Sequence, residues 1–359
     1  MDPIDMIEAH GTDALRLTLS VGNTPGNDLK FDEENVVNNK LFINKLWNAS
    51  RFVFTNLTSN NPSQPSLTTN GRSDDISTIE KDLLKNYDKL MYHEKWILSR
   101  IRYLSDMVTD AMEEYNFSEA GIELQAFTKN EFCDYYIEEF KLTKEASKYG
   151  EQVMLYTMNK LLKLWHPYIP FVTAEIYTRL GFTGDLIEQE YARVLFPRDE
   201  EVEKGKQVII DTIRTIRNLR AENNIPPSKT VGLQIYASPK NKEMLEEVLA
   251  LIAGIVKADS YELIDNKPLQ GDFAYGVVKA GVEVYIDTAN ALDVEKEKER
   301  LKEQITDTKE YIAILDKKLL NESFVKRAPQ NLVRAEMEKK SQAGEKLKKL
   351  EEKLEWLST

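Results

Sequence analysis

A repeat of apolar residues every seven positions near the C-terminus restricts the fold of this chain more than any other feature of the sequence. From Leu292 onward glycine is nearly absent, and the apolar residues fall at two positions of a heptad. The first position holds Val294, Leu301, Thr308 and Leu315. The second position lies four residues further on and holds Ile305, Ile312 and Leu319. Such a pattern is typical of a long helix that packs lengthwise against another helix.

The pattern resumes after a polar interruption at Asn321 to Pro329. Apolar residues then recur at alternating steps of four and three, at Ala343, Leu347, Leu350, Leu354 and Leu357. Two similar helices joined by a short polar break are expected to fold back on each other as an antiparallel hairpin. Residues 291–359 are therefore predicted to form a coiled-coil arm whose helices are each about 40 Å long, at about 1.5 Å per residue.

Residues 1–200 have helical periodicity. Asp2 is a helix-capping residue, and Pro3 suits the first turn of a helix that we expect to continue to Leu19. Further helices are expected at about Asp32 to Thr55, Asp75 to Tyr115, Ser118 to Ser147 and Gly150 to Leu180, the last with a break at Trp165-His166-Pro167. Because 359 residues exceed one domain of about 150, more than one core is expected, and residues 1–200 are assigned to a helical bundle.

Residues 201–290 have a different pattern. A helix at about Val202 to Asn223 precedes short runs that are rich in Val, Ile and Tyr and bounded by Gly, Pro and Asn. These runs, which flank a helix at about Asn241 to Ala253, are Val231 to Tyr236, Tyr261 to Ile264, Ala274 to Val278 and Val282 to Ile286. They predict strands, so this segment is predicted to be a small α/β module in a chain that is otherwise mainly α-helical.

The composition argues against several classes of protein. The single cysteine, Cys133, cannot form an internal disulfide, and together with three scattered histidines it cannot supply the ligands of a structural zinc site. No run approaches the roughly 18 apolar residues of a transmembrane helix, and the first ten residues lack the features of a signal peptide. We therefore expect a cytoplasmic protein with no membrane segment and no bound metal.

The charge is unevenly distributed. The formal net charge of the chain is −12, which argues against a general affinity for nucleic acid. The segment from Asp293 to Thr359 has 16 Lys and Arg against 15 Asp and Glu, so the residues before it carry the remaining −13. Any RNA-binding surface must therefore be a local patch of basic side chains.

Several motifs resemble aminoacyl-tRNA synthetases. The opening segment, Asp2 to Arg16, resembles the segment that follows the KMSKS loop in class I enzymes of the valine, isoleucine and leucine group. Three later motifs resemble the anticodon-binding region of the valyl-tRNA synthetase family, namely Asn44 to Val53, Leu164 to Ile176 and Ile213 to Pro227. The repeat from Leu292 to Pro329 resembles the C-terminal coiled-coil arm of that family, so the resemblance covers nearly the whole chain.

This resemblance implies a function. The ATP-binding motifs and the editing domain of the family would precede residue 1, so we expect a tRNA-binding C-terminal fragment of an ATP-dependent valine-tRNA ligase that is inactive alone. It implies valine tRNA and the missing N-terminal domains as partners, no membrane or DNA partner, no cofactor in this chain and a monomeric state. The isoleucine enzymes commonly end in a cysteine-rich zinc module, which a single cysteine excludes here.

The resemblance also implies candidate RNA contacts in the first part of the bundle. The family reads its anticodon near the first two helices, which here carry Lys30, Asn44, Lys45, Arg51 and Phe52. Arg51 and Phe52 combine a cation with an aromatic face, a combination that holds an unstacked RNA base. The competing interpretation, in which Phe52 is a core aromatic beside Trp47, stays open.

Two further basic groups are candidates. Arg214, Arg217 and Arg220 recur every three residues and would form a slanting basic stripe on a helix, suited either to phosphates or to acidic neighbours. Around the turn of the arm the basic residues outnumber the acidic ones, and they comprise Lys317, Lys318, Lys326, Arg327, Arg334, Lys339 and Lys340. By resemblance they would contact the outer corner of the tRNA, and the alternative is an ordinary charged coiled-coil surface.

Catalytic chemistry is not indicated. His166 precedes Pro167 and is interpreted as a helix-end or core histidine, because no paired nucleophile or carboxylate motif accompanies it. Two other functions remain open. One is a structural coiled-coil adaptor or oligomerisation protein without RNA binding, and the other is an enzyme with a site inside the bundle.

Overall fold

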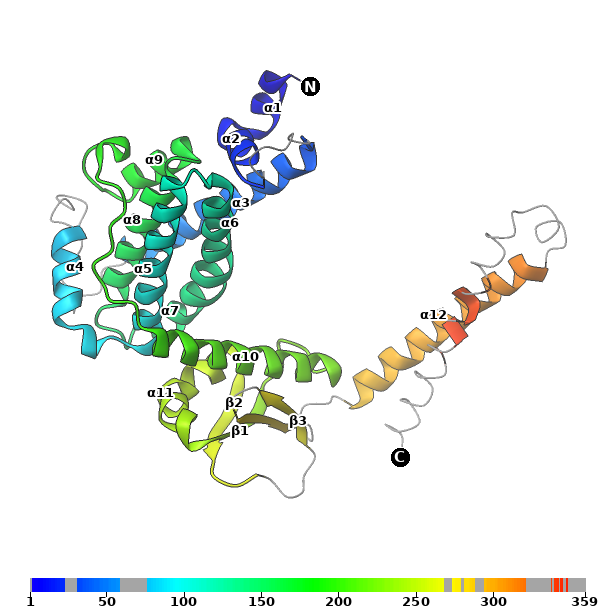
Figure 1. The fold of residues 1–359 in the computed structure, drawn as a ribbon. Coiled ribbons are helices and arrows are strands. Elements are labelled where there is room, and N and C mark those ends of the chain that lie inside the picture. Colours follow the sequence, from blue (N-terminus) through cyan, green and yellow to red (C-terminus); the bar gives the residue numbers. More distant parts are fainter. Residues whose placement is uncertain are drawn as a thin grey trace.

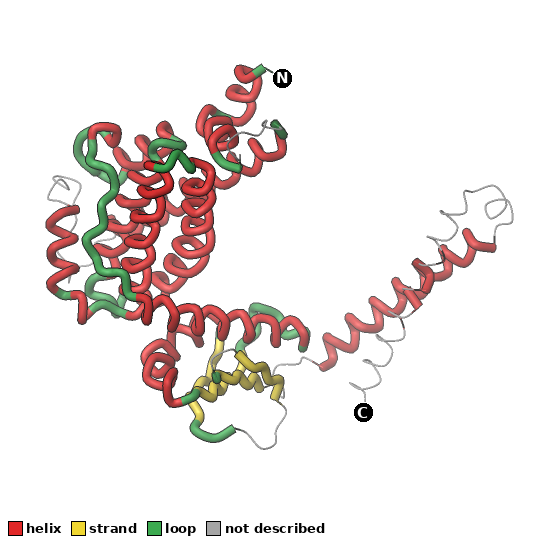
Figure 2. Tube along the Cα trace, viewed as in Figure 1, coloured by secondary structure: helices red, strands yellow, loops and turns green. Residues whose placement is uncertain are grey.

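The computed structural model describes residues 2–22, 31–58, 76–267, 273–278, 281–287 and 294–320, together with single positions between 337 and 347. A bundle of helices lies above a long helix, α10, and a small sheet lies on the other side of that helix (Figure 1). Figure 2 shows that strands are confined to this sheet within the described part of the chain. The prediction of a mainly α-helical chain with a small α/β module is confirmed.

The N-terminal helix is interrupted. Helix α1 (Pro3–His10) begins as expected, since the Asp2 side chain accepts a hydrogen bond of 2.9 Å from the Ile4 amide. It ends at Gly11, whose φ of 92° lies in the left-handed region that favours glycine, and α2 (Thr12–Ser20) then starts in a new direction. The single helix expected up to Leu19 is therefore two helices.

The bundle continues through the next elements of the chain. They are α3 (Glu33–Thr58), α4 (Ile76–Lys85), the 3-10 turn η2 (Tyr87–Lys89), α5 (Tyr92–Glu113), α6 (Phe117–Ala126), the π-helix η3 (Phe127–Tyr136), α7 (Ile137–Thr143), α8 (Gly150–Trp165), α9 (Pro170–Arg179) and the 3-10 turn η4 (Leu186–Glu188). The break expected after Trp165 is present, and α9 restarts at Pro170. The helix expected from Asp75 to Tyr115 is split, because Leu90 and Met91 are extended before α5 begins.

The segment expected as one helix from Ser118 to Ser147 has a π-helical middle. Residues 127–136 take the wider π turn between α6 and α7. A ten-residue segment is too short for its apolar pattern to distinguish a π turn from an α turn, so this segment was predicted as part of an α-helix. Thr128, inside this segment, is buried and accepts a hydrogen bond of 2.9 Å from the indole of Trp165 on α8.

The α/β module follows the expected order. It comprises α10 (Glu200–Glu222), β1 (Val231–Ala237), α11 (Pro239–Val256), β2 (Ala258–Ile264), β3 (Phe273–Val278) and β4 (Val282–Asp287). The strand order is β2-β1-β4-β3, with β1 and β2 parallel across the α11 connection and the other pairs antiparallel. Alternate residues of β1, namely Val231, Leu233 and Ile235, are buried, as a sheet covered on one face requires.

Two separate groups of buried apolar side chains form the cores. One extends from Leu17 to Phe196 within the bundle, and the other extends from Ile209 to Ile286 between α10, α11 and the sheet. Helix α10 contacts α5 as well as β3, β4 and α11. It therefore joins the bundle to the sheet (Figure 1).

Helix α12 (Val294–Leu320) stands apart from the bundle and the sheet in Figure 1. Its more buried positions recur at steps of three and four, as the heptad predicts, at Ile305, Thr308, Ile312, Leu315 and Leu319. Lys340 lies beside this helix, with its Nζ 2.5 Å from a carboxylate oxygen of Asp316, and Ala343 is buried. Residues 321–336 and most of the second helix of the arm lie outside the described residues, so the rest of the hairpin stays a prediction.

Candidate nucleic-acid interface

Four of the predicted RNA contacts lie on α3, while Lys30 lies outside the described residues. Asn44 and Arg51 are exposed and are two helical turns apart, so they share one face. Lys45 and Phe52 have the same spacing on the adjoining face and are half-buried. The four side chains therefore form two parallel rows along one side of the helix.

Lys45 is held by the π-helical segment. Its Nζ lies 2.8 Å from a carboxylate oxygen of Asp134 and donates to the Lys129 carbonyl at 3.5 Å. Both side chains of this pair are partly exposed to solvent, so the pair is weak. A phosphate could displace the Asp134 carboxylate at small cost.

Phe52 is both a packed aromatic and a ring with a cation above it. Its ring meets Phe140 edge-on, with centroids 6.1 Å apart, and packs against the bundle core. The Nζ of Lys141 lies 5.3 Å from the centre of the Phe52 ring. Trp47, also half-buried against the core, has the Arg179 guanidinium 5.0 Å from its ring. Both interpretations of Phe52 thus have a structural basis.

Sequence reasoning missed the basic residues at the end of α7. Lys141, Lys144 and Lys148 are exposed in and just after this helix. Lys141 lies over Phe52, so the end of α7 meets the end of α3, where Arg51 is exposed. Their spacing of three and four residues was the available signal, but nothing in the sequence places α7 next to α3.

The basic residues of α10 have different environments. Arg214 and Arg217 are exposed, and the Arg214 guanidinium lies 3.3 Å from an oxygen of Asp211. Arg220 is 6% exposed and donates to the backbone carbonyls of Val256, Pro226 and Lys229. The basic stripe expected from the sequence therefore stops at Arg217, because the guanidinium of Arg220 is used to join α10 to the end of α11 and to the segment before β1.

The arm contributes four described candidates, two on α12 and two in the part that follows. Lys317 and Lys318 are exposed in the last turn of α12. Lys326, Arg327 and Arg334 lie outside the described residues. Lys339 is exposed, and Lys340 is ion-paired with Asp316.

His93, which is buried, and His166, which is half-buried, both have structural partners. His93 is 2% exposed, and burial, with a smaller contribution from the nearby charge of Lys206, lowers its pKa to about 3. Its Nε2 lies 3.1 Å from the Thr143 hydroxyl. His166 follows α8, and its Nδ1 lies 2.9 Å from the Thr173 hydroxyl, in keeping with its interpretation as a helix-end residue.

The residues with assigned positions contain neither a metal-binding cluster nor a membrane-spanning helix. Among these, no three or more His, Cys, Asp or Glu side chains gather in a way that could hold a metal ion. Within the same residues, no helix combines the length and the apolar character needed to cross a bilayer.

Comparison with known proteins adds the decisive observation. A family model described as the anticodon-binding domain of tRNA ligase matches residues 94–237, and one described as the valyl tRNA synthetase tRNA binding arm matches residues 293–358. A valine-tRNA ligase of Clostridium perfringens is 36% identical over 99% of this chain. The chain belongs to the valine-tRNA ligase family.

Other members of the family have similar levels of identity. The valine-tRNA ligase of Thermotoga maritima is 33% identical over 98% of the chain, and that of Listeria innocua is 34% identical over 99%. The chain spans 38–39% of the length of these relatives and corresponds to their C-terminal region. A solved leucyl-tRNA synthetase complex with tRNA, from Agrobacterium radiobacter K84, has a TM-score of 0.39 at 13% identity over 78% of this chain and 29% of that one, a likeness too weak to bear on the fold.

The candidate residues lie in different parts of the matched sequence. The anticodon-binding match begins in α5 and ends in β1, so it includes the end of α7 and the exposed arginines of α10. The candidates on α3 precede that match but fall within the part shared with whole valine-tRNA ligases. Lys317 and Lys318 fall within the match to the tRNA-binding arm.

Proposed function

We propose that this chain is the part of a valine-tRNA ligase that grips valine tRNA at two separate places. The helical bundle contacts the anticodon region, and the arm contacts the outer corner of the tRNA. In the full-length protein, this grip holds the acceptor end of the tRNA in place while another part attaches valine with ATP. The chain itself acts as a monomer in the cytoplasm and needs no cofactor for binding.

One observation carries the proposal. Two family models, one described as an anticodon-binding domain and the other as a tRNA-binding arm, match the same chain in succession. The second match includes the separate helix α12. The basic and aromatic side chains where α3 meets α7 suit single-stranded RNA, because a base stacks on an aromatic ring while cations hold its phosphates. The exposure of Arg51 and the position of the Lys141 ammonium over the Phe52 ring support this role.

The affinity arises from positioning rather than from overall charge. The chain has a net charge of −12, so binding depends on local groups of Lys and Arg and weakens as salt is added. Two contacts linked through one folded chain reinforce each other, because the first contact raises the effective concentration of the second.

The test is a salt-titrated binding measurement with three RNAs: valine tRNA, valine tRNA with an altered anticodon, and an unrelated tRNA. Valine tRNA is expected to bind most tightly, and the altered anticodon is expected to lose about 1–3 kcal/mol for each base whose edge the bundle reads by hydrogen bonds. Equal binding of all three RNAs contradicts the proposed anticodon contact. A dimer that forms with rising concentration in sedimentation, combined with no tRNA binding at low salt, instead favours the coiled-coil adaptor.

A further inference from the structure

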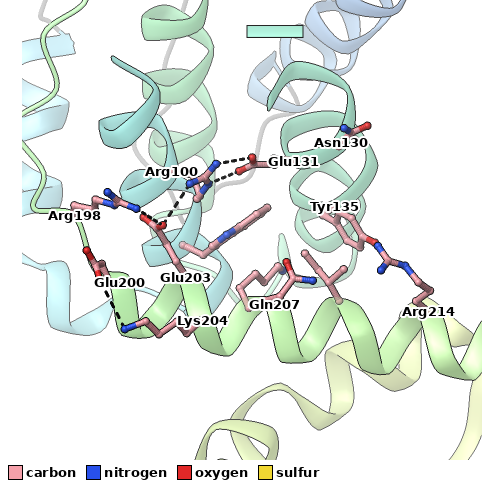
Figure 3. Close-up of a pocket in the computed structure, with 13 residues that line it drawn as sticks. Arg100, Asn130, Glu131, Tyr135, Arg198, Glu200, Glu203, Lys204, Gln207 and Arg214 are labelled. Carbon is pink, nitrogen blue, oxygen red and sulfur yellow. Dashed lines mark hydrogen bonds and ion pairs between the residues drawn. The ribbon is translucent and has the colours of Figure 1, made fainter. Parts of the chain in front are cut away.

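A groove separates the π-helical segment η3 from the first half of α10. Its volume is about 550 Å³, within the range of small-ligand sites. Asn130 and Tyr135 line it from η3, and Glu203, Gln207 and Arg214 line it from α10 (Figure 3). No residue of this groove other than Arg214 was singled out by the sequence.

One end of the groove is closed by a network of charges. The Arg100 guanidinium lies 2.7 Å from a carboxylate oxygen of Glu131 and 3.4 Å from one of Glu203. Arg198 also pairs with Glu203 at 3.4 Å, and its guanidinium lies 4.5 Å from the ring centre of Tyr103. The two carboxylates are therefore neutralised by arginines, which reduces their repulsion of an anion entering the groove.

The other end of the groove holds groups of a different kind. Asn130 and Gln207 present exposed amides, Arg214 is exposed, and the Tyr135 ring is half-buried. Figure 3 shows the ring of Tyr135 and the guanidinium of Arg214 next to each other at this end. Amides hydrogen-bond the edges of bases, aromatic rings stack on their faces, and arginine holds phosphates, so this set fits one nucleotide.

The charge of the groove differs from that of the chain. Five basic side chains and three carboxylates line it, and one of the five, Lys206, is paired with the buried Glu139, which leaves four against three. The chain as a whole has a net charge of −12. The π-helical segment that forms one wall of the groove also contacts the α3 candidate Lys45, through the Asp134 carboxylate and the Lys129 carbonyl. The excess of basic groups and this contact with α3 favour RNA over an uncharged small molecule.

We propose that this groove binds one unpaired nucleotide of the anticodon loop, with the base against Tyr135 and the phosphate at Arg214. The edge of the base then meets the amides of Asn130 and Gln207. This inference rests on the proposed function and deepens it, because it adds a second base-binding position to the one at Phe52. It also gives the π-helical turn a role, since η3 carries Asn130 and Tyr135 on the same wall.

The experiment uses valine tRNA in which single unpaired anticodon-loop purines are replaced by 2-aminopurine, whose fluorescence falls when it stacks on an aromatic ring. Binding of the whole chain is expected to quench the probe at one loop position beyond those sensitive to Phe52. Tyr135→Leu is expected to abolish that quenching and weaken binding about fivefold or more, while Tyr135→Phe keeps both.

Arg214→Gln tests the phosphate contact, and Arg217→Gln is its matched control. Both side chains are exposed on α10, but only Arg214 lines the groove. Arg214→Gln is expected to reduce the quenching and to lower the slope of log affinity against log salt by roughly 0.7. Arg217→Gln is expected to keep the quenching at that position.

The outcomes separate the two proposals. If the unaltered chain discriminates the anticodon but Tyr135→Leu and Arg214→Gln bind and quench like it, the groove inference is wrong and the proposed function stands. If the unaltered chain does not bind valine tRNA, both are wrong. If Tyr135→Leu does not fold, the comparison of Arg214→Gln with Arg217→Gln tests the groove inference instead.

Discussion

Lys206 and Glu139 form an ion pair that is buried between α10 and α7. The Lys206 side chain is 1% exposed, and that of Glu139 is wholly buried. Burial raises the pKa of Glu139 and lowers that of Lys206, and each charge partly opposes the shift of the other. The Lys206 ammonium also lies 4.4 Å from the ring centre of Trp96. This pair fixes the position of α10 against the bundle and hence one wall of the groove.

Replacing one partner of this pair is expected to destabilise the fold strongly. Lys206→Met leaves the Glu139 carboxylate buried without a cation, so the free energy of unfolding should fall by about 3–5 kcal/mol. The double variant Lys206→Met with Glu139→Leu removes both charges and should recover much of that loss. Urea denaturation of the unaltered chain, Lys206→Met, Glu139→Leu and the double variant measures it, and strictly additive losses would contradict the coupling.

The stability of the bundle is expected to fall in mild acid because of His93. Its pKa is about 3 in the fold against an ordinary 6.5, so below 6.5 the unfolded chain binds a proton that the folded chain excludes. The free energy of unfolding therefore decreases as the pH falls through this window, by about 1.4 kcal/mol per pH unit from this group. His93→Gln should remove that contribution, as seen in denaturation between about pH 7 and about pH 4.5. Parallel pH profiles of the two proteins would show that His93 does not cause this loss of stability.

Phe52 and Lys141 are expected to act together on the anticodon. Phe52→Ala should weaken binding of valine tRNA by about 1–3 kcal/mol and reduce discrimination against the altered anticodon. Lys141→Gln should weaken binding of both RNAs, since a phosphate contact does not read sequence. Thermal unfolding is the control for Phe52→Ala, because loss of the fold without loss of discrimination would support the core interpretation of this ring.

Replacement of Arg220 and of Arg217 removes the same charge but is expected to change the free energy of unfolding by different amounts. Arg220→Gln removes donors to three backbone carbonyls, of which the Val256 carbonyl is buried, and should lower the free energy of unfolding by about 2–4 kcal/mol. Arg217→Gln alters an exposed side chain and should change it by less than about 0.5 kcal/mol. Equal effects in chemical denaturation would show that Arg220 is not held as the structure places it.

The arm offers a matched pair of neighbouring residues. Leu315 is 2% exposed, whereas Ile314 is 55% exposed on the same helix. Leu315→Ala should weaken the packing of α12 by about 2 kcal/mol or more, while Ile314→Ala should leave it nearly unchanged. Hydrogen exchange of residues 305–320 measures the difference. Equal protection in both variants would mean that the heptad seam is not buried.

Local chemistry accounts for the parts of the fold that the sequence predicted correctly. The alternating residues of β1, the periodicity of α10 and the helix break before Pro170 each follow from neighbours in the chain. The interruption at Gly11 and the π turn at 127–136 were missed, because each is a short departure within a stretch whose apolar residues otherwise recur with a helical period. For the candidate site, Arg51, Phe52 and Arg214 were found from residue type and resemblance, but Lys141 and Tyr135 were not.

The sequence by itself determined the heptad arm, the helical bundle, the strands of the module and the family to which the chain belongs, because these depend on periodicity and ordered motifs. Only the tertiary structure decided which charges face solvent. Arg214, Arg217 and Arg220 have the same spacing and charge, yet the packing of α11 encloses only the last of them. Lys206 looks like a surface lysine in the sequence, and it is buried because α7 brings Glu139 to meet it. Whether a basic residue binds RNA or holds the fold together depends on contacts between segments far apart in the chain, which local pattern does not encode.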